Sequence, residues 1–162
     1  MKAKLIVGLG LLLGVVGISQ ADTVFTNTAG SLGTGGNWSN GLPGAGNPGT
    51  VDVDGYLGQA SQDTGIFSGA TVTVGSGATL SGGIDFPAAG GNTWIINDAT
   101  VNLSDDFFSK NSTFILNAGS SVNAGIGTGV DGHFLAQFAG GNITINGGSH
   151  TAGGWFGSNQ NT

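Results

Sequence analysis

Three aspartates recur at a spacing that could place them in one column of a repetitive fold. Asp85, Asp106 and Asp131 are 21 and 25 residues apart, and Asp105 adjoins the second of them. Carboxylates stacked about 5 Å apart repel one another unless a cation or water separates them, and calcium prefers clusters of oxygen ligands. A calcium column at Asp85, Asp106 and Asp131 is therefore a hypothesis, set against the simpler interpretation of three solvated turn aspartates. No other cofactor is indicated.

Catalytic chemistry has few candidate residues. A uronate lyase needs basic side chains, and after residue 21 the only lysine or arginine is Lys110. A glycoside hydrolase needs a defined pair of carboxylates, which Asp98, Asp105 and Asp106 could supply beside His133, but no arginine is present to hold a substrate. We therefore predict a protein that is not an enzyme. A carbohydrate-binding or carbohydrate-cleaving fragment is the alternative.

Composition excludes several classes of protein and partner. The 162 residues include 34 Gly, no Cys and nine acidic residues that are all Asp, a composition that favours turns and strands over helices. A hydrophobic content of 38% is enough for a folded core. Nucleic acids and anionic lipids are bound through Lys and Arg, so neither is expected as a partner.

Residues 1–21 have the pattern of a secretory signal peptide. Lys2 and Lys4 precede an uncharged apolar run at 5–18, and Ser19 and Ala21 are small residues at the positions that a signal peptidase reads. This run is shorter than the roughly 20 residues needed to span a bilayer. We expect cleavage after Ala21, no stable membrane span thereafter, and a secreted or cell-surface location. The mature chain would have one lysine against nine aspartates, a net charge of −8.

Short segments with apolar first and third residues recur about every twenty residues. They lie at 51–53, 72–74, 94–96, 114–116 and 143–145, with starts 21, 22, 20 and 29 residues apart. The last four are each followed by a turn of small or polar residues and then by a second short strand, a pattern typical of β-rich repeats. Repeats of this length bury their apolar faces by stacking on one another.

These repeats predict an all-β, right-handed parallel β-helix, or β-solenoid, of about five coils. The handedness follows from the general preference of parallel crossovers. Because neighbouring strand residues face opposite sides, we expect an inward column of Val51, Val53, Val72, Val74, Trp94, Ile96, Phe114, Leu116, Ile143 and Ile145. The middle residues Thr73, Ile95, Ile115 and Thr144 are expected to point outward. An antiparallel sandwich is the second choice, because its hairpins require no fixed repeat.

The chain divides into three predicted parts. Residues 1–21 are the signal peptide, 22–50 an N-terminal cap and 51–162 the solenoid repeats. A cap would cover the open core and unpaired edge of the first coil, and Trp38 is the side chain expected to plug it. Residues 157–162 contain neither a cap nor an anchor, which is consistent with truncation at the C-terminus.

A family resemblance appears in the predicted cap. Residues 36–43, Gly-Asn-Trp-Ser-Asn-Gly-Leu-Pro, and 44–51, Gly-Ala-Gly-Asn-Pro-Gly-Thr-Val, resemble the opening of bacterial exported β-helix proteins. These include autotransporter passenger-like proteins with autotransporter-associated β-strand repeats and secreted proteins with a PEP-CTERM sorting tail. The resemblance implies a parallel β-helix that acts in surface display, adhesion or extracellular matrix structure. The sequence departs from these families in having neither a translocator barrel nor a Val-Pro-Glu-Pro tail.

Together these features predict an exported structural or adhesive module without catalytic activity. Its expected partners are components of the cell surface or extracellular matrix, with glycans as one class. Contacts would form through flat outer faces carrying Asn, Thr and Ser. Ile95, Ile115 and the pair Phe107 and Phe108 are candidate apolar contact points.

Overall fold

The structure is a computed structural model that describes residues 21–57, 67, 69–82, 91–104, 107–108, 112–124, 134–137, 142–152 and 156–159. Apart from one short 3-10 helix, η1 (Gly35–Asn37), the regular elements in these ranges are β-strands. The predicted all-β class is confirmed. Within the same ranges, no helix has the length and apolarity that crossing a membrane requires.

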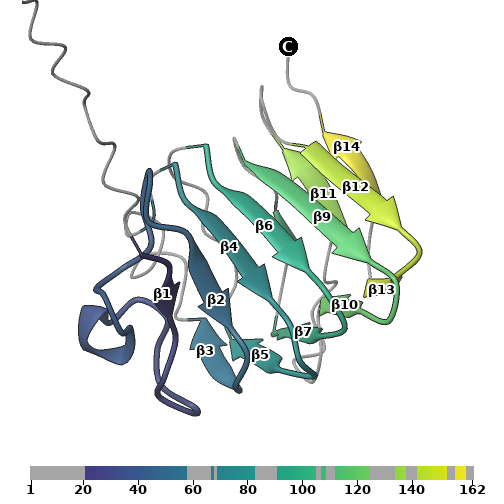
Figure 1. The fold of residues 1–162 in the computed structure, drawn as a ribbon. Coiled ribbons are helices and arrows are strands. Elements are labelled where there is room, and N and C mark those ends of the chain that lie inside the picture. The colour runs from purple at the N-terminus through teal and green to yellow at the C-terminus, as the bar shows by residue number, and fades with distance from the viewer. Residues whose placement is uncertain are drawn as a thin grey trace, which may run out of the picture.

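The strands form three sheets whose pairs are all parallel (Figure 1). Sheet I contains β1 (Thr23–Val24), β2 (Gly49–Val51), β4 (Thr71–Val74), β6 (Thr93–Ile96), β9 (Thr113–Asn117) and β12 (Asn142–Asn146). Sheet II contains β3 (Gly55–Leu57), β5 (Thr79–Gly82), β7 (Thr100–Leu103), β10 (Ser121–Ala124) and β13 (Ser149–Ala152). Sheet III contains β8 (Phe107–Phe108), β11 (Phe134–Gln137) and β14 (Phe156–Asn159).

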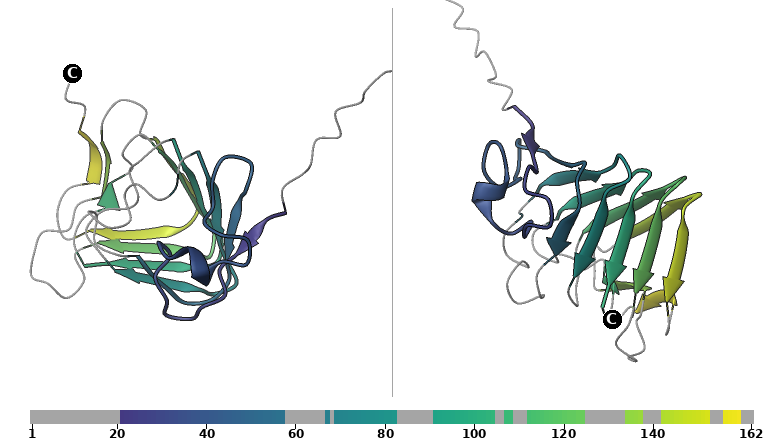
Figure 2. Two further views of the ribbon diagram at one scale, coloured as in Figure 1. Left: turned by 90° about the vertical axis from the view of Figure 1, so that its left-hand side faces the viewer. Right: turned by 90° about the horizontal axis from the view of Figure 1, so that it is seen from below.

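From β2 onward, consecutive strands fall in different sheets, and strands at equivalent positions in successive turns pair with each other. This arrangement is a β-solenoid, as the sequence predicts. Three described turns have a strand in every sheet, namely β6–β7–β8, β9–β10–β11 and β12–β13–β14. The two earlier turns, β2–β3 and β4–β5, have described strands in sheets I and II only, so about three turns are complete rather than the five expected. Seen from the N-terminal end, the chain winds clockwise as it recedes, which is the right-handed sense (Figure 2, left).

The corners between sheets I and II lie where the sequence predicts turns. The four corners after β4, β6, β9 and β12 each contain a residue with positive φ, namely Gly77 at 76°, Asp98 at 49°, Gly119 at 83° and Gly147 at 118°. Left-handed backbone of this kind is accessible to Gly and tolerated by Asp and Asn. The second strands predicted after these turns are confirmed as β5, β7, β10 and β13.

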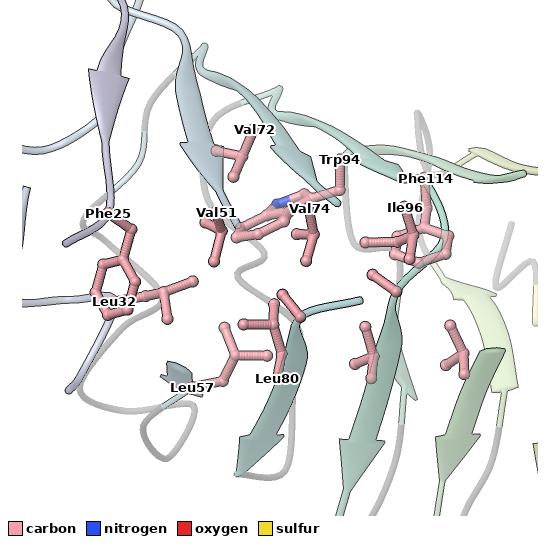
Figure 3. Packing of buried hydrophobic residues seen from close by; sticks show 14 of the residues in the cluster. Phe25, Leu32, Val51, Leu57, Val72, Val74, Leu80, Trp94, Ile96 and Phe114 are labelled. Atoms are coloured by element: carbon pink, nitrogen blue, oxygen red, sulfur yellow. The ribbon is translucent and has the colours of Figure 1, made fainter. Parts of the chain in front are cut away.

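The apolar core runs between sheets I and II along the axis of the solenoid (Figure 3). Residues from equivalent positions lie over one another, as in the pairings Val72–Trp94 and Trp94–Phe114. The column predicted to face inward is buried at Val51, Val72, Val74, Trp94, Ile96, Phe114 and Leu116. On the opposite face of sheet I, Thr73, Ile95, Ile115 and Thr144 lie in one row, as expected. Ile95 and Ile115 are half-buried rather than exposed.

Three residues of the predicted column are not fully buried. Ile145 lies opposite Leu116 but is 37% exposed, because β12 is the last described strand of sheet I and only one of its edges is paired. Val53 is only partly buried, because β2 ends at Val51 and the register shifts so that Val51 lies opposite Val74 instead of Val72. Ile143, in β12, is likewise only partly buried.

Residues of the predicted cap pack on the first turn. β1 adds a sixth strand to sheet I, and Phe25, Leu32 and Trp38 are buried in the common core. The Trp38 Nε1 donates a hydrogen bond to the Leu32 carbonyl at 2.8 Å. Gly49 leaves room for this indole, because a Cβ there would lie 3.0 Å from Trp38 Cζ3. The capping role itself stays a prediction.

Candidate functional site

The residues of the calcium hypothesis, Asp85, Asp106 and Asp131, all lie outside the described residues. The same holds for Asp105 and for Lys110 and His133. In the part of the chain that the structure describes, no group of three or more Asp or His side chains is arranged to hold a metal ion. Asp98, the remaining carboxylate of the hydrolase alternative, lies at an exposed corner. The calcium column and the carbohydrate-cleaving alternative therefore both remain predictions from the sequence.

The outer face of sheet I carries a row of asparagines at its edge with sheet II. Asn97, Asn117 and Asn146 occupy equivalent positions on three successive turns. The Asn117 amide donates to the Asn97 Oδ1, and the Asn146 Nδ2 donates to the Asn117 Oδ1 at 2.9 Å. Because each amide both donates and accepts, the row repeats one interaction along the solenoid. This amide row stays accessible to solvent at Asn97 and Asn146.

A similar arrangement covers the outer face of sheet II. The Ser121 hydroxyl donates to the Thr100 Oγ1 at 3.2 Å, and the Asn123 Nδ2 donates to the Asn102 Oδ1 at 2.9 Å. Both pairs join residues that lie directly opposite each other on β7 and β10. The face therefore presents neutral donors and acceptors at the spacing of the strands.

Tyr56 is the aromatic side chain on this face. It is the middle residue of β3, whose neighbours Gly55 and Leu57 are buried, so strand alternation turns the phenol outward, where it is 44% exposed. Its N–H donates to the Gly30 carbonyl and its carbonyl accepts from the Leu32 N–H, so residues 30–32 hold one edge of β3, while β5 pairs with the other edge. The exposed ring thus sits on a fixed strand.

Two shallow depressions adjoin Tyr56. One, of about 420 Å³, is lined by Tyr56, Ser81, Gly82, Asn102, Leu103 and Ser104. The other, of about 300 Å³, is lined by Ala29, Asp54, Gly55, Tyr56, Thr79 and Ser81. Tyr56 and Ser81 line both, so the two depressions share one wall. Their volumes fall near the lower end of the range of ligand pockets.

The charge of this region is low. Asp54 is the ionisable acid in the lining, and its Oδ1 accepts a hydrogen bond from the Thr79 N–H at 2.8 Å. No lysine or arginine occurs among the described residues. The described residues of this surface can therefore form hydrogen bonds and stack on an aromatic ring, but they offer no cation to an anionic ligand.

Sequence reasoning did not single out Tyr56. The apolar contact points that it named are placed elsewhere: Ile95 and Ile115 lie half-buried on sheet I, and Phe107 and Phe108 form β8 in sheet III. The available signal was the alternation of Gly55, Tyr56 and Leu57, in which the chain's single Tyr occupies the outward position.

No protein family model, curated protein or solved structure matches this chain.

Proposed function

We propose that the chain is an exported structural or adhesive module of a cell surface or extracellular matrix and has no catalytic activity. The observation that supports this most directly is the rows of hydrogen-bonded Asn, Ser and Thr side chains on the outer faces of sheets I and II. A partner that contacts such a row meets the same chemical groups once per turn, at intervals of about 4.8 Å.

Repetition of this kind suits adhesion to extended partners. Each hydrogen bond to a neutral group contributes little by itself, but several contacts made together raise the apparent affinity. The net charge of −6 on the full chain disfavours polyanionic partners. Neutral surfaces are therefore the expected targets.

Export and the family relationship are part of the same proposal. They rest on the signal-peptide pattern at 1–21 and on the resemblance of residues 36–51 to the opening of autotransporter-like and PEP-CTERM-type exported β-helix proteins. The β-solenoid is compatible with this relationship. Secretion of the full-length chain from a bacterial host, with an N-terminus at Asp22, would be the expected result.

Adhesion can be tested with fluorescently labelled mature protein on washed bacterial cells and on extracted matrix. We expect saturable binding that is weakened by a combined Asn102→Ala and Asn123→Ala change. Thr34→Ala, an exposed change in the 22–50 segment, is the matched control and should bind as the wild type does. The adhesive role would be contradicted if the wild type showed saturable binding to neither the cells nor the matrix.

The proposed lack of catalytic activity is tested by a separate assay. The protein is incubated with neutral and acidic polysaccharides, and the reducing ends are measured over time. We expect no release above a blank. Sugar release that disappears in Asp106→Ala would overturn this part and favour the carbohydrate-cleaving alternative.

A further inference from the structure

We propose that the outer face of sheet II around Tyr56 is a binding site for a neutral polysaccharide chain. This inference rests on the proposed adhesive function and names the partner class of that function. The site consists of the Tyr56 ring and the two depressions beside it, and is called the Tyr56 site below.

The ring supplies an apolar platform. One face of a pyranose ring carries mainly C–H groups, which pack against an aromatic ring, while the sugar hydroxyls point to the sides. Tyr56 is 44% exposed and projects from a strand whose backbone is bonded on both sides. A rigid aromatic side chain loses little conformational entropy when a ligand covers it.

Polar groups with unused hydrogen-bonding capacity surround the ring. The Asn102 Oδ1 already accepts from Asn123, which orients the amide so that its Nδ2 remains a donor. Among the described residues, neither this Nδ2 nor the hydroxyls of Ser81 and Tyr56 has a hydrogen-bond partner. Asp54 uses its Oδ1 to accept from the Thr79 N–H, and its second oxygen adds an acceptor. Sugar hydroxyls can satisfy all of these groups, because each hydroxyl both donates and accepts.

The layout favours a chain over a single sugar. The lining runs from Ala29 and Asp54, past Tyr56 and Ser81, to Asn102 and Ser104. These residues belong to the 22–50 segment and to the three turns that follow it, a distance of about 14 Å at the usual strand spacing. A ligand that fills both depressions must cross Tyr56, so it needs more than one ring.

The charge of the Tyr56 site favours uncharged ligands over anionic ones. With one carboxylate and no described cation, the Tyr56 site repels uronates and sulfated sugars while accepting neutral hydroxyls. Among the described lining residues there is one carboxylate, which falls short of the pair that glycoside hydrolysis ordinarily uses. We therefore assign the described residues of the site to binding.

The test uses the chain from residue 22 to residue 162 and measures its binding to soluble neutral glucan, mannan, galactan and xylan by affinity electrophoresis and calorimetry. Polygalacturonate serves as the anionic comparison. We expect binding to at least one neutral polysaccharide and none to polygalacturonate. Tyr56→Ala should weaken that binding roughly tenfold through loss of the stacking surface. Tyr56→Phe should keep most of the affinity, and Asn102→Ala should weaken it several-fold.

Thr34→Ala, an exposed change in the 22–50 segment and outside the lining of the Tyr56 site, is the matched control and should bind as the wild type does. Circular dichroism and thermal melting check that each variant is folded. Failure of every neutral polysaccharide to bind, or equal binding by folded Tyr56→Ala and wild type, would overturn the proposal. If the wild type still adheres to cells or matrix in either case, the Tyr56 site is wrong while the adhesive function stands. If the wild type binds a neutral polysaccharide but adheres to neither cells nor matrix, the adhesive function is wrong.

Discussion

A Cβ atom built on Gly82 would lie 1.8 Å from the carbonyl oxygen of Leu57 on the neighbouring strand. Gly82 also has a φ of 147°, which side-chain-bearing residues rarely adopt. We therefore expect Gly82→Ala to lower the free energy of unfolding by about 2–4 kcal/mol. Urea denaturation measures this change. Gly36→Ala, where nothing lies within 4 Å of the added Cβ, should change stability by less than about 0.5 kcal/mol, and equal losses in both variants would contradict the close approach.

The position of a turn along the solenoid should determine the cost of truncating its core side chain. Leu116 and Ile145 lie opposite each other, but Leu116 is fully buried and Ile145 is 37% exposed. Leu116→Ala is expected to cost about 2–5 kcal/mol and Ile145→Ala less than half as much, since a partly exposed side chain leaves a smaller cavity. Chemical denaturation of the two variants checks the order. A larger loss for Ile145→Ala would mean that the last turn is covered.

The buried amide of Asn92 should matter more than an exposed amide of the same type. Asn92 accepts a hydrogen bond from the Ala70 N–H and donates to the Phe67 carbonyl, both at 3.0 Å. Asn92→Ala leaves both buried backbone groups without this partner, so we expect a loss of about 2–4 kcal/mol. Asn97→Ala, at the exposed end of the amide row, should cost about 1 kcal/mol or less. Comparable melting temperatures for the two variants would show that Asn92 does not bridge these turns.

The solenoid could be predicted from the sequence because two local rules agree with the fold. Alternation along each strand identifies the buried residues, and small or polar residues mark the corners, as at Asp98 and Gly119. Sheet III was not predicted, although the register of β8, β11 and β14 places Phe107, Phe134 and Phe156 at equivalent positions. They are 27 and 22 residues apart in sequence, so they do not follow the period of about twenty residues that identifies the other strands. The pairing of Val51 with Val74 was also missed, because the spacing of the apolar segments aligns Val51 with Val72.

The Tyr56 site was harder to predict, because its parts come from different turns. Asp54, Ser81 and Asn102 are separated by more than twenty residues each, and each alone is an ordinary turn or surface residue. The parallel register brings them to one face only after the coil lengths are known. Composition indicated outer faces of neutral polar side chains, but it could not show which face carries an exposed aromatic ring.

The calcium hypothesis makes a separate thermal prediction. If Asp85, Asp106 and Asp131 share calcium ions, millimolar calcium should raise the melting temperature, because a ligand that binds only the folded state stabilises it. Asp106→Asn should remove most of this rise, whereas Asp52→Asn, outside the column, should leave it intact. Equal melting temperatures in calcium and in chelator would reject the hypothesis and leave three solvated turn aspartates.

The stacking of turns in parallel register is the central claim, and engineered disulfides test it directly because the chain contains no cysteine. Thr100 lies opposite Thr79 on one side and Ser121 on the other, at the usual strand spacing of about 4.8 Å, which suits a disulfide. The double variants Thr79→Cys/Thr100→Cys and Thr100→Cys/Ser121→Cys should therefore oxidise readily in the folded protein. Thr100→Cys/Asn123→Cys, displaced by two residues along the strand, should keep its free thiols. Thiol titration that finds the displaced pair oxidised and the two opposite pairs reduced would contradict the solenoid.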